Sequence, residues 1–273
     1  MKKFVLYNAS LILIISNMRR YILFLISFFI LVSCDKSSVI IYSTTTNEMI
    51  DVPETFGETA IREHSYHNGV GQITFNGIVS VIPDTAFWDD STIVHIELPP
   101  TIKVIGASSF AGCRNFREIK LPTGLVSIGA AAFSGCSSLE GVTIPDGIVC
   151  IDGSTFADCQ KLSSIHIPES VKEIGDYAFF NCKSLKEVRL PCALSSIGES
   201  AFAGCHSITE LSIPDSVTVI SDHAFFACYQ LQKVKLPKML RRIDSYAFVG
   251  CPRLTIIEWP ESIELIEKDA FEM

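Results

Sequence analysis

The stretch 185–207, LKEVRLPCALSSIGESAFAGCHS, decides the fold of this chain because its pattern recurs every 23 residues. Phenylalanine repeats in this register at Phe87, Phe110, Phe133, Phe156, Phe179, Phe202, Phe225, Phe248 and Phe271. Cysteine follows three residues later in seven of these units, at Cys113, Cys136, Cys159, Cys182, Cys205, Cys228 and Cys251. A fixed period between about 20 and 29 residues is typical of a solenoid whose coils cannot bury their apolar faces alone.

Each unit begins with a short strand that a proline ends. Val188 and Leu190 lie two residues apart, so their side chains point to the same side of a strand and the residues between them point outward. Pro191 lacks the N–H that a ladder needs, so the strand stops there, and stacked copies should form a parallel sheet. The second half, residues 197–205, contains Gly, or Asp, Asn or Ser in other units, on both sides of an Ala-Phe pair. This pattern predicts a turn, a short helical turn and a second turn.

The unit, Leu-x-x-Ile-x-Leu-Pro followed by Ile-Gly-x-x-Ala-Phe-x-Gly-Cys, resembles the leucine-rich repeats of BspA-like bacterial surface proteins, the treponemal type. The resemblance covers residues 70–273 as nine units, the last of them truncated. It implies a fold of the α/β class, a right-handed leucine-rich-repeat solenoid with a short-stranded parallel sheet on one face and turns or short helical turns on the other. It also implies export, and adhesion to host matrix proteins or to other cells.

The N-terminal region carries the features of a secretory signal. Arg19-Arg20 precede an apolar run of about a dozen residues, Tyr21–Val32, shorter than the roughly 20 that span a bilayer. Leu31-Val32-Ser33-Cys34 resembles the bacterial lipobox, in which the cysteine is acylated and becomes the first residue of the mature protein. An ordinary signal peptide with an incidental Cys34 is the alternative. A second apolar run precedes the arginines, where a signal peptide has no use for it, so we expect Met18 to be the true start.

The sequence therefore predicts four regions. Residues 1–33 are the signal peptide, residues 34–46 a lipidated flexible tether, residues 47–69 a degenerate N-terminal cap repeat, and residues 70–273 the solenoid. A cap is expected because terminal coils must shield the core. We expect an exported protein, lipid-anchored in the bacterial envelope at the outer membrane or cell surface.

Composition excludes several classes of protein. With 273 residues, 48% of them hydrophobic and 19% charged, the chain is neither disordered nor collagen-like. Its formal charge is −8, and without the four basic residues before Cys34 it has 18 basic against 30 acidic residues, a charge of −12. Phosphate contact needs a basic face, so we expect no nucleic-acid partner.

The cysteines and histidines do not form a recognisable reactive site. The repeated cysteines lie one coil apart, whereas zinc-binding pairs lie about two to four residues apart. Parallel Cβ atoms about 4.8 Å apart would have to approach to about 3.5–4.5 Å for a disulfide, and nine cysteines after Cys34 cannot all pair. A ladder of buried free thiols is expected, and the pairing of Cys150 and Cys192 stays open. Glu63-His64-Ser65-Tyr66-His67 has neither the order nor the spacing of a His-Glu-x-x-His zinc motif. We expect no enzyme activity, no metal and no cofactor.

Two surfaces could bind a partner. The first, which we call the strand face, consists of outward strand residues of mixed charge: His95, Glu97, Glu118, Lys120, His166, Glu187, Arg189, Glu210, Lys233, Lys235 and Glu258. The second, which we call the aromatic patch, lies near the Ala-Phe turns: Tyr177, Phe180, His223, Phe226, Tyr229 and Tyr246. Clustered exposed aromatic side chains often mark an interface. The alternatives are a merely solvated face for the first set, and sideways packing onto the next coil for the second.

The leading hypothesis is a membrane-anchored, non-enzymatic interaction protein that presents its sheet to a protein ligand, either a host matrix protein or a bacterial surface protein. A glycan-binding lipoprotein of a polysaccharide-uptake system is the alternative, although the strand face has no aromatic residue on which a sugar ring would stack. A structural spacer without a ligand is the third possibility.

Overall fold

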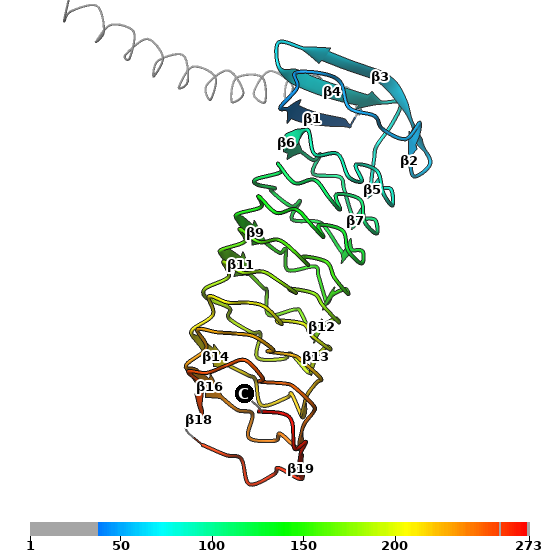
Figure 1. Cartoon of the computed structure of the whole chain (residues 1–273). Helices are drawn as coiled ribbons and strands as arrows, with labels where there is room; N and C mark the ends of the chain where they lie inside the picture. The colour runs from blue at the N-terminus through cyan, green and yellow to red at the C-terminus, as the bar shows by residue number, and fades with distance from the viewer. Residues whose placement is uncertain (1–37, 257, 272–273) are drawn as a thin grey trace, which may run out of the picture. The chain divides into compact units, whose positions relative to one another are not determined.

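The computed structural model describes residues 38–256 and 258–271, which carry nineteen β-strands and no helix. Figure 1 shows successive turns of the chain stacked on one another between the strands at the β1 end and β19. The signal peptide, the start at Met18 and the acylation of Cys34 fall on residues outside the described part, so they stay predictions.

An antiparallel sheet covers the first end of the stack. Its strands are ordered β2 (Thr55–Phe56), β3 (Thr59–His67), β4 (Val70–Phe75), β1 (Val39–Thr44) and β6 (Ile93–Glu97). Strand β6 belongs to the first regular coil. Strand β1 pairs with β6 on one side and with β4 on the other. The edge of the solenoid is thereby paired instead of open, which protects it from pairing with another chain.

This cap differs from the sequence expectation. Residues 39–44 are a strand of the sheet, with Tyr42 buried, where we expected a flexible tether over 34–46. Residues 47–69 form no coil of the repeat, because β3 continues into β4 through an Asn68-Gly69 turn in which both residues have positive φ. That conformation is the one a tight hairpin requires. Strand β4, which we expected to start the first coil, therefore pairs antiparallel with β3 and β1.

Two columns of short parallel strands run through the coils. The first column continues from β6 through single bridges at Glu118 and Glu187 and through β9 (Gly141–Thr143), β11 (Ser164–His166), β14 (Glu210–Ser212), β16 (Lys233–Lys235) and β18 (Thr255–Ile256). The second contains β5 (Val81–Ile82), β7 (Val104–Ile105), β8 (Ser127–Ile128), β10 (Cys150–Ile151), β12 (Glu173–Ile174), β13 (Ser196–Ile197), β15 (Val219–Ile220), β17 (Arg242–Ile243) and β19 (Leu265–Ile266). Paired residues are 23 positions apart, as in Ile105↔Ile128, so the sequence period is the height of one coil.

The Ala-Phe segments are turns and not helical turns. In 108–112, Ser108 has φ 53° and Gly112 has φ 80°, and left-handed residues of this kind recur four positions apart in coil after coil. The Phe110 N–H donates to the Ala132 carbonyl of the next coil, 2.8 Å away, and is therefore not available for a helical bond within its own coil. The expected α/β class with short helical turns on one face is thus wrong. The described residues form a solenoid of leucine-rich-repeat type built from strands and turns alone.

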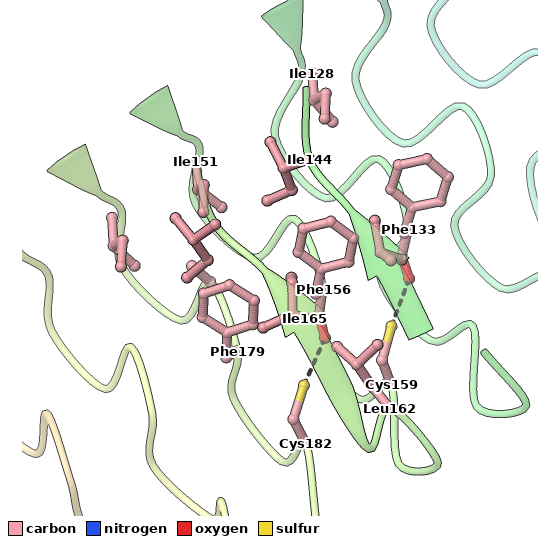
Figure 2. Close-up of a cluster of buried hydrophobic side chains, with 14 of the residues drawn as sticks. Ile128, Phe133, Ile144, Ile151, Phe156, Cys159, Leu162, Ile165, Phe179 and Cys182 are labelled. Carbon is pink, nitrogen blue, oxygen red and sulfur yellow. Dashed lines mark hydrogen bonds between the residues drawn. The ribbon is translucent and has the colours of Figure 1, made fainter. Parts of the chain in front are cut away.

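The core is a continuous stack of rings accompanied by thiols (Figure 2). The rings of Phe133, Phe156 and Phe179 stack nearly parallel, with centroids 5.5 and 5.6 Å apart. Each repeated cysteine donates its S–H to the phenylalanine carbonyl of the preceding coil, as Cys159 Sγ does to Phe133 O at 3.2 Å. The same bond joins Cys182 to Phe156. All seven cysteines of the ladder are free and buried, and burial raises the pKa of Cys182 well above its usual value. These thiols therefore connect coils, and the raised pKa makes Cys182 a poor nucleophile.

Candidate functional site

The strand face is built by alternation along each short strand. In β14 and β16 the middle residue, Leu211 or Val234, enters the core, and the residues on either side are exposed. The backbone bonds of each strand run to the coils above and below it, so its position is fixed without help from the outward side chains. The side chains of the strand face are consequently free to vary without breaking the ladder.

The structure brings some charges of the strand face together. Lys233 Nζ lies 3.1 Å from Glu210 Oε1 across adjacent strands. At the cap end, the His95 ring lies 3.4 Å from Glu97 Oε1 and 3.8 Å from Glu118 Oε1. These contacts are solvent-exposed, and pairs of this kind contribute about 0–1 kcal/mol to stability, so a charged ligand would displace them at little cost.

Other members of the strand face lie apart from this pairing. Arg189 turns toward Glu169, 3.6 Å away, which is not a strand residue. The first strand column shifts register in the last coil, because Lys233 pairs with Thr255, 22 residues on, whereas the second column keeps the 23-residue step at Arg242↔Leu265. Glu258 therefore follows a strand whose register has shifted, and it is exposed at the described end of the sheet.

The aromatic patch lies on the turns, and much of its ring surface is used internally. The rings of His223 and Tyr246 stack with centroids 4.8 Å apart, and the Phe226 ring lies 5.5 Å from His223. Tyr177 contacts Phe180 edge-on and donates its hydroxyl to Glu199 at 2.9 Å, a bond that raises the pKa of Tyr177. The stacking favours sideways packing onto neighbouring coils, although Tyr177, Phe226, Tyr229 and Tyr246 keep exposed surface.

Sequence analysis missed one member of this surface. His206 stacks on Tyr229 with centroids 4.6 Å apart, and partial burial together with the Lys183 charge lowers its pKa. The signal was present, because His206 and Tyr229 are 23 residues apart and so hold equivalent positions in adjacent coils.

Three members of the aromatic patch adopt a backbone conformation that is unusual for large side chains. Tyr177, His223 and Tyr246 have φ of 58°, 54° and 57°, at the position that Ser108 and Ser154 hold in other coils. Left-handed backbone is uncommon for bulky residues, but this position is left-handed in coil after coil, so the conformation belongs to the repeat. Tyr177 and Tyr246 are also about two-fifths exposed. The patch is therefore a second candidate surface, although its rings already contact one another.

The described residues contain little that supports other chemistry. No three His, Cys, Asp or Glu side chains in this part of the chain come together as metal ligands would. Cys192 is exposed and Cys150 half-buried, and both are free thiols. Within residues 38–256 and 258–271, no helix has the length and apolar character needed to cross a membrane.

Two solved structures are similar to this chain in sequence and structure. Among solved structures, a leucine-rich cell surface protein of Faecalibacterium prausnitzii is 26% identical, with 66% of this chain matched to 57% of that chain and a TM-score of 0.47. This chain thus spans little more than half the length of that protein. A leucine-rich repeat protein of T. pallidum is 30% identical, with 60% of this chain matched to 70% of that chain and a TM-score of 0.48. No curated protein matches the sequence.

A family model provides the assignment. The model for the BspA type leucine-rich repeat region, which has six copies, matches residues 40–163, 80–209 and 149–273. These ranges overlap, and together they cover the cap and every coil. The chain therefore belongs to the BspA-type leucine-rich repeat family.

Proposed function

We propose that this chain is a non-enzymatic surface protein that binds a protein ligand, in a host matrix or on another bacterium, through the strand face. The observation that carries the proposal is that different groups of each coil stabilise the stack and form the exposed surface. Backbone groups and inward side chains hold the stack together, and the outward strand residues form one exposed surface of charged and polar groups. Membership of the BspA-type family supports a binding scaffold in preference to an enzyme.

The charge along the strand face supports a ligand of mixed charge. Acidic and basic residues occur together along the strand face, as Glu118 with Lys120 in one coil and Glu210 with Lys233 across two strands. A surface that carries charges of both signs selects the orientation of a charged partner and increases the rate of encounter more than the affinity.

A matched pair of variants tests this proposal. The first reverses Glu118, Lys120, Glu187, Arg189, Lys233 and Lys235. The second changes Lys103→Glu and Lys172→Glu next to the second strand column, which lowers the formal charge by the same amount. We expect the full chain to bind immobilised extracellular-matrix proteins or bacterial surface extracts, the first variant to lose this binding, and the second to keep it. Equal binding by all three proteins would show that the strand face is not the site.

We also propose that the protein is exported and held at the bacterial surface by acylation of Cys34. The Arg19-Arg20 pair, the apolar run and the lipobox-like sequence support this, and mass spectrometry of the mature N-terminus tests it. Acyl chains contribute about 0.8 kcal/mol per buried CH₂, so Cys34→Ala should release the protein from the membrane fraction. Protease treatment of intact cells distinguishes an outward-facing anchor from an inward-facing one, and an inward-facing protein would contradict adhesion.

The strand face and the aromatic patch do not favour glycan binding. Sugar recognition commonly uses an open aromatic ring face, the strand face has no aromatic residue, and each stacked pair covers one face of both its rings. A glycan array should therefore give no specific signal that depends on these two surfaces.

A further inference from the structure

A groove of about 580 Å³ lies between the cap and the first coil, and it uses no residue of the strand face or the aromatic patch. One wall is the cap segment 46–53 and the other is the turn segment 84–92. Ile50, Ala86 and Phe87 are buried and form an apolar floor between the walls. Its volume lies within the range of about 300–1,000 Å³ that is common for ligand sites.

Both walls are held in place without a ligand. The cap wall is fixed by a bond from Thr45 N–H to Thr92 O at 2.8 Å, and by a bond from the Thr44 hydroxyl to Glu48 O at 3.1 Å. In the other wall, the Asp89 N–H donates to Ala111 O of the next coil at 2.6 Å. Binding to such a groove requires little ordering of the protein, which favours affinity.

The side chains at the mouth combine exposed apolar surface with negative charge. Trp88 is 63% exposed and Met49 is 55% exposed. In other coils the Trp88 position holds small residues such as Ala111 and Ala157, so the stacking of coils does not require an indole there. Five carboxylates line the groove, and no Lys or Arg does: Glu48, Asp51, Asp84, Asp89 and Asp90.

The carboxylates differ in whether they already accept hydrogen bonds or lie near a basic side chain. Asp84 accepts the Ala107 N–H, Asp90 accepts the Thr92 N–H, and Asp89 lies 3.9 Å from Arg114. Glu48 and Asp51, on the cap wall, are exposed, and the Asp51 charge also acts on the His64 ring. The lining of the groove therefore has net negative charge beside an accessible indole.

We propose that this groove binds lysine or arginine side chains of an extended basic segment of a partner protein. An indole face attracts an ammonium or guanidinium group, and nearby carboxylates add charge complementarity. Met49 and Val52 can contact the aliphatic stems of these side chains, which a small inorganic cation would not use. The proposal goes beyond the strand face, because it adds a second contact site, built from cap and turn residues, that does not require the first to bind.

Synthetic peptides test it on the full chain. A Gly/Ser peptide carrying several lysines is compared with peptides in which every lysine is replaced by Arg, Gln or Glu, and with spermine as a free polyamine. We expect the Lys and Arg peptides to bind, and the Gln and Glu peptides to bind about tenfold more weakly or not at all. Binding should weaken as salt shortens the screening length from about 10 Å at 0.1 M to about 3 Å at 1 M.

Variants locate the binding. Trp88→Ala should lower the affinity by about two- to fivefold, and Glu48→Gln with Asp51→Asn should lower it and reduce its salt dependence. Trp259→Ala, and Glu140→Gln with Glu261→Gln, at exposed positions outside the groove, are the matched controls and should change nothing. Thermal unfolding confirms that each variant is folded, which is expected for Trp88→Ala because alanine stands there in other coils.

Three outcomes would overturn the proposal. They are equal binding of the Gln peptide, binding of spermine as tight as that of the Lys peptide, and no difference between Trp88→Ala and Trp259→Ala. None of these would affect the strand-face proposal, whose variants leave the groove intact.

Discussion

Removing one ring from the middle of the phenylalanine stack tests whether the coils share a single core. Phe156 is fully buried between Phe133 and Phe179, at centroid distances of 5.5 and 5.6 Å, with ring planes within 5° of parallel on both sides. The change Phe156→Ala removes both stacked contacts and leaves a cavity bounded by two coils.

The cost follows from burial and from the ring pairs. Deleting a fully buried phenylalanine costs about 3–5 kcal/mol, and each aromatic pair adds about 0.5–1.5 kcal/mol beyond the buried area. We therefore expect Phe156→Ala to lower the free energy of unfolding by about 4–5 kcal/mol, the upper part of the range for a buried phenylalanine, because two ring pairs are lost. Phe248→Ala should cost less, about 3 kcal/mol, because its neighbour Phe271 is only half-buried and the end of the stack can relax.

Urea unfolding followed by circular dichroism measures these differences, and hydrogen exchange shows where protection is lost. In a solenoid each coil contacts only its neighbours, so protection should fall first in the coils that contain Phe133, Phe156 and Phe179. Phe226→Ala, on the surface of a turn three coils away, is the control and should cost about 1 kcal/mol or less. If Phe156→Ala cost no more than Phe226→Ala, the shared core would be refuted.

Two further results follow from the titratable groups. In a Cys34→Ser chain, a thiol reagent at neutral pH should modify exposed Cys192 first and Cys150 more slowly, since burial and the Asp152 hydrogen bond raise the pKa of Cys150 to about 11. The seven buried cysteines of the ladder should react only when the protein unfolds. Rapid reaction of Cys159 in the native protein would contradict its burial. Burial lowers the pKa of His64, whose Nε2 lies 2.7 Å from Tyr42 Oη, although the Asp51 charge opposes the shift, so the folded state binds fewer protons than the unfolded state. Its contribution to stability is therefore complete above pH about 6.5 and lost as the pH falls below that value, and His64→Gln should remove this part of the pH dependence measured by urea titration.

The regular part of the fold could be predicted because its signals repeat. A constant 23-residue step in Phe, Ile, Pro and Cys requires that equivalent residues stack, and the structure shows the rings of Phe110 and Phe133 within 3° of parallel. The outward or inward direction of a strand residue follows from alternation alone, as for Glu210, Leu211 and Ser212. These predictions needed only the period and the strand geometry.

The turns and the cap could not be predicted in the same way. A left-handed backbone at Ser108, Ala131 or Tyr177 has no signature in residue type, because the conformation is imposed by bonds to the next coil and not by local preference. The cap pairs segments far apart in sequence, such as β1 with β6, and the 23-residue period contains no information about that pairing. One signal was available, because Asn68-Gly69 between two strand-forming runs is a strong indicator of a hairpin.

Stacking uses many of the backbone hydrogen-bonding groups of the coils, and this limits which groups remain to contact a ligand. The N–H groups of Phe110, Phe133 and Phe156 all bond to carbonyls of the following coil, so the interior coils have few main-chain groups to offer a ligand. Specificity must then lie in side chains that vary from coil to coil, such as Glu187 where another coil has Gly141. Because those side chains contribute little to the stack, binding can change by substitution without loss of the fold. The groove beside Trp88 differs from these surfaces, which recur from coil to coil. It forms where the repeat meets the cap, and so it occurs once along the described residues.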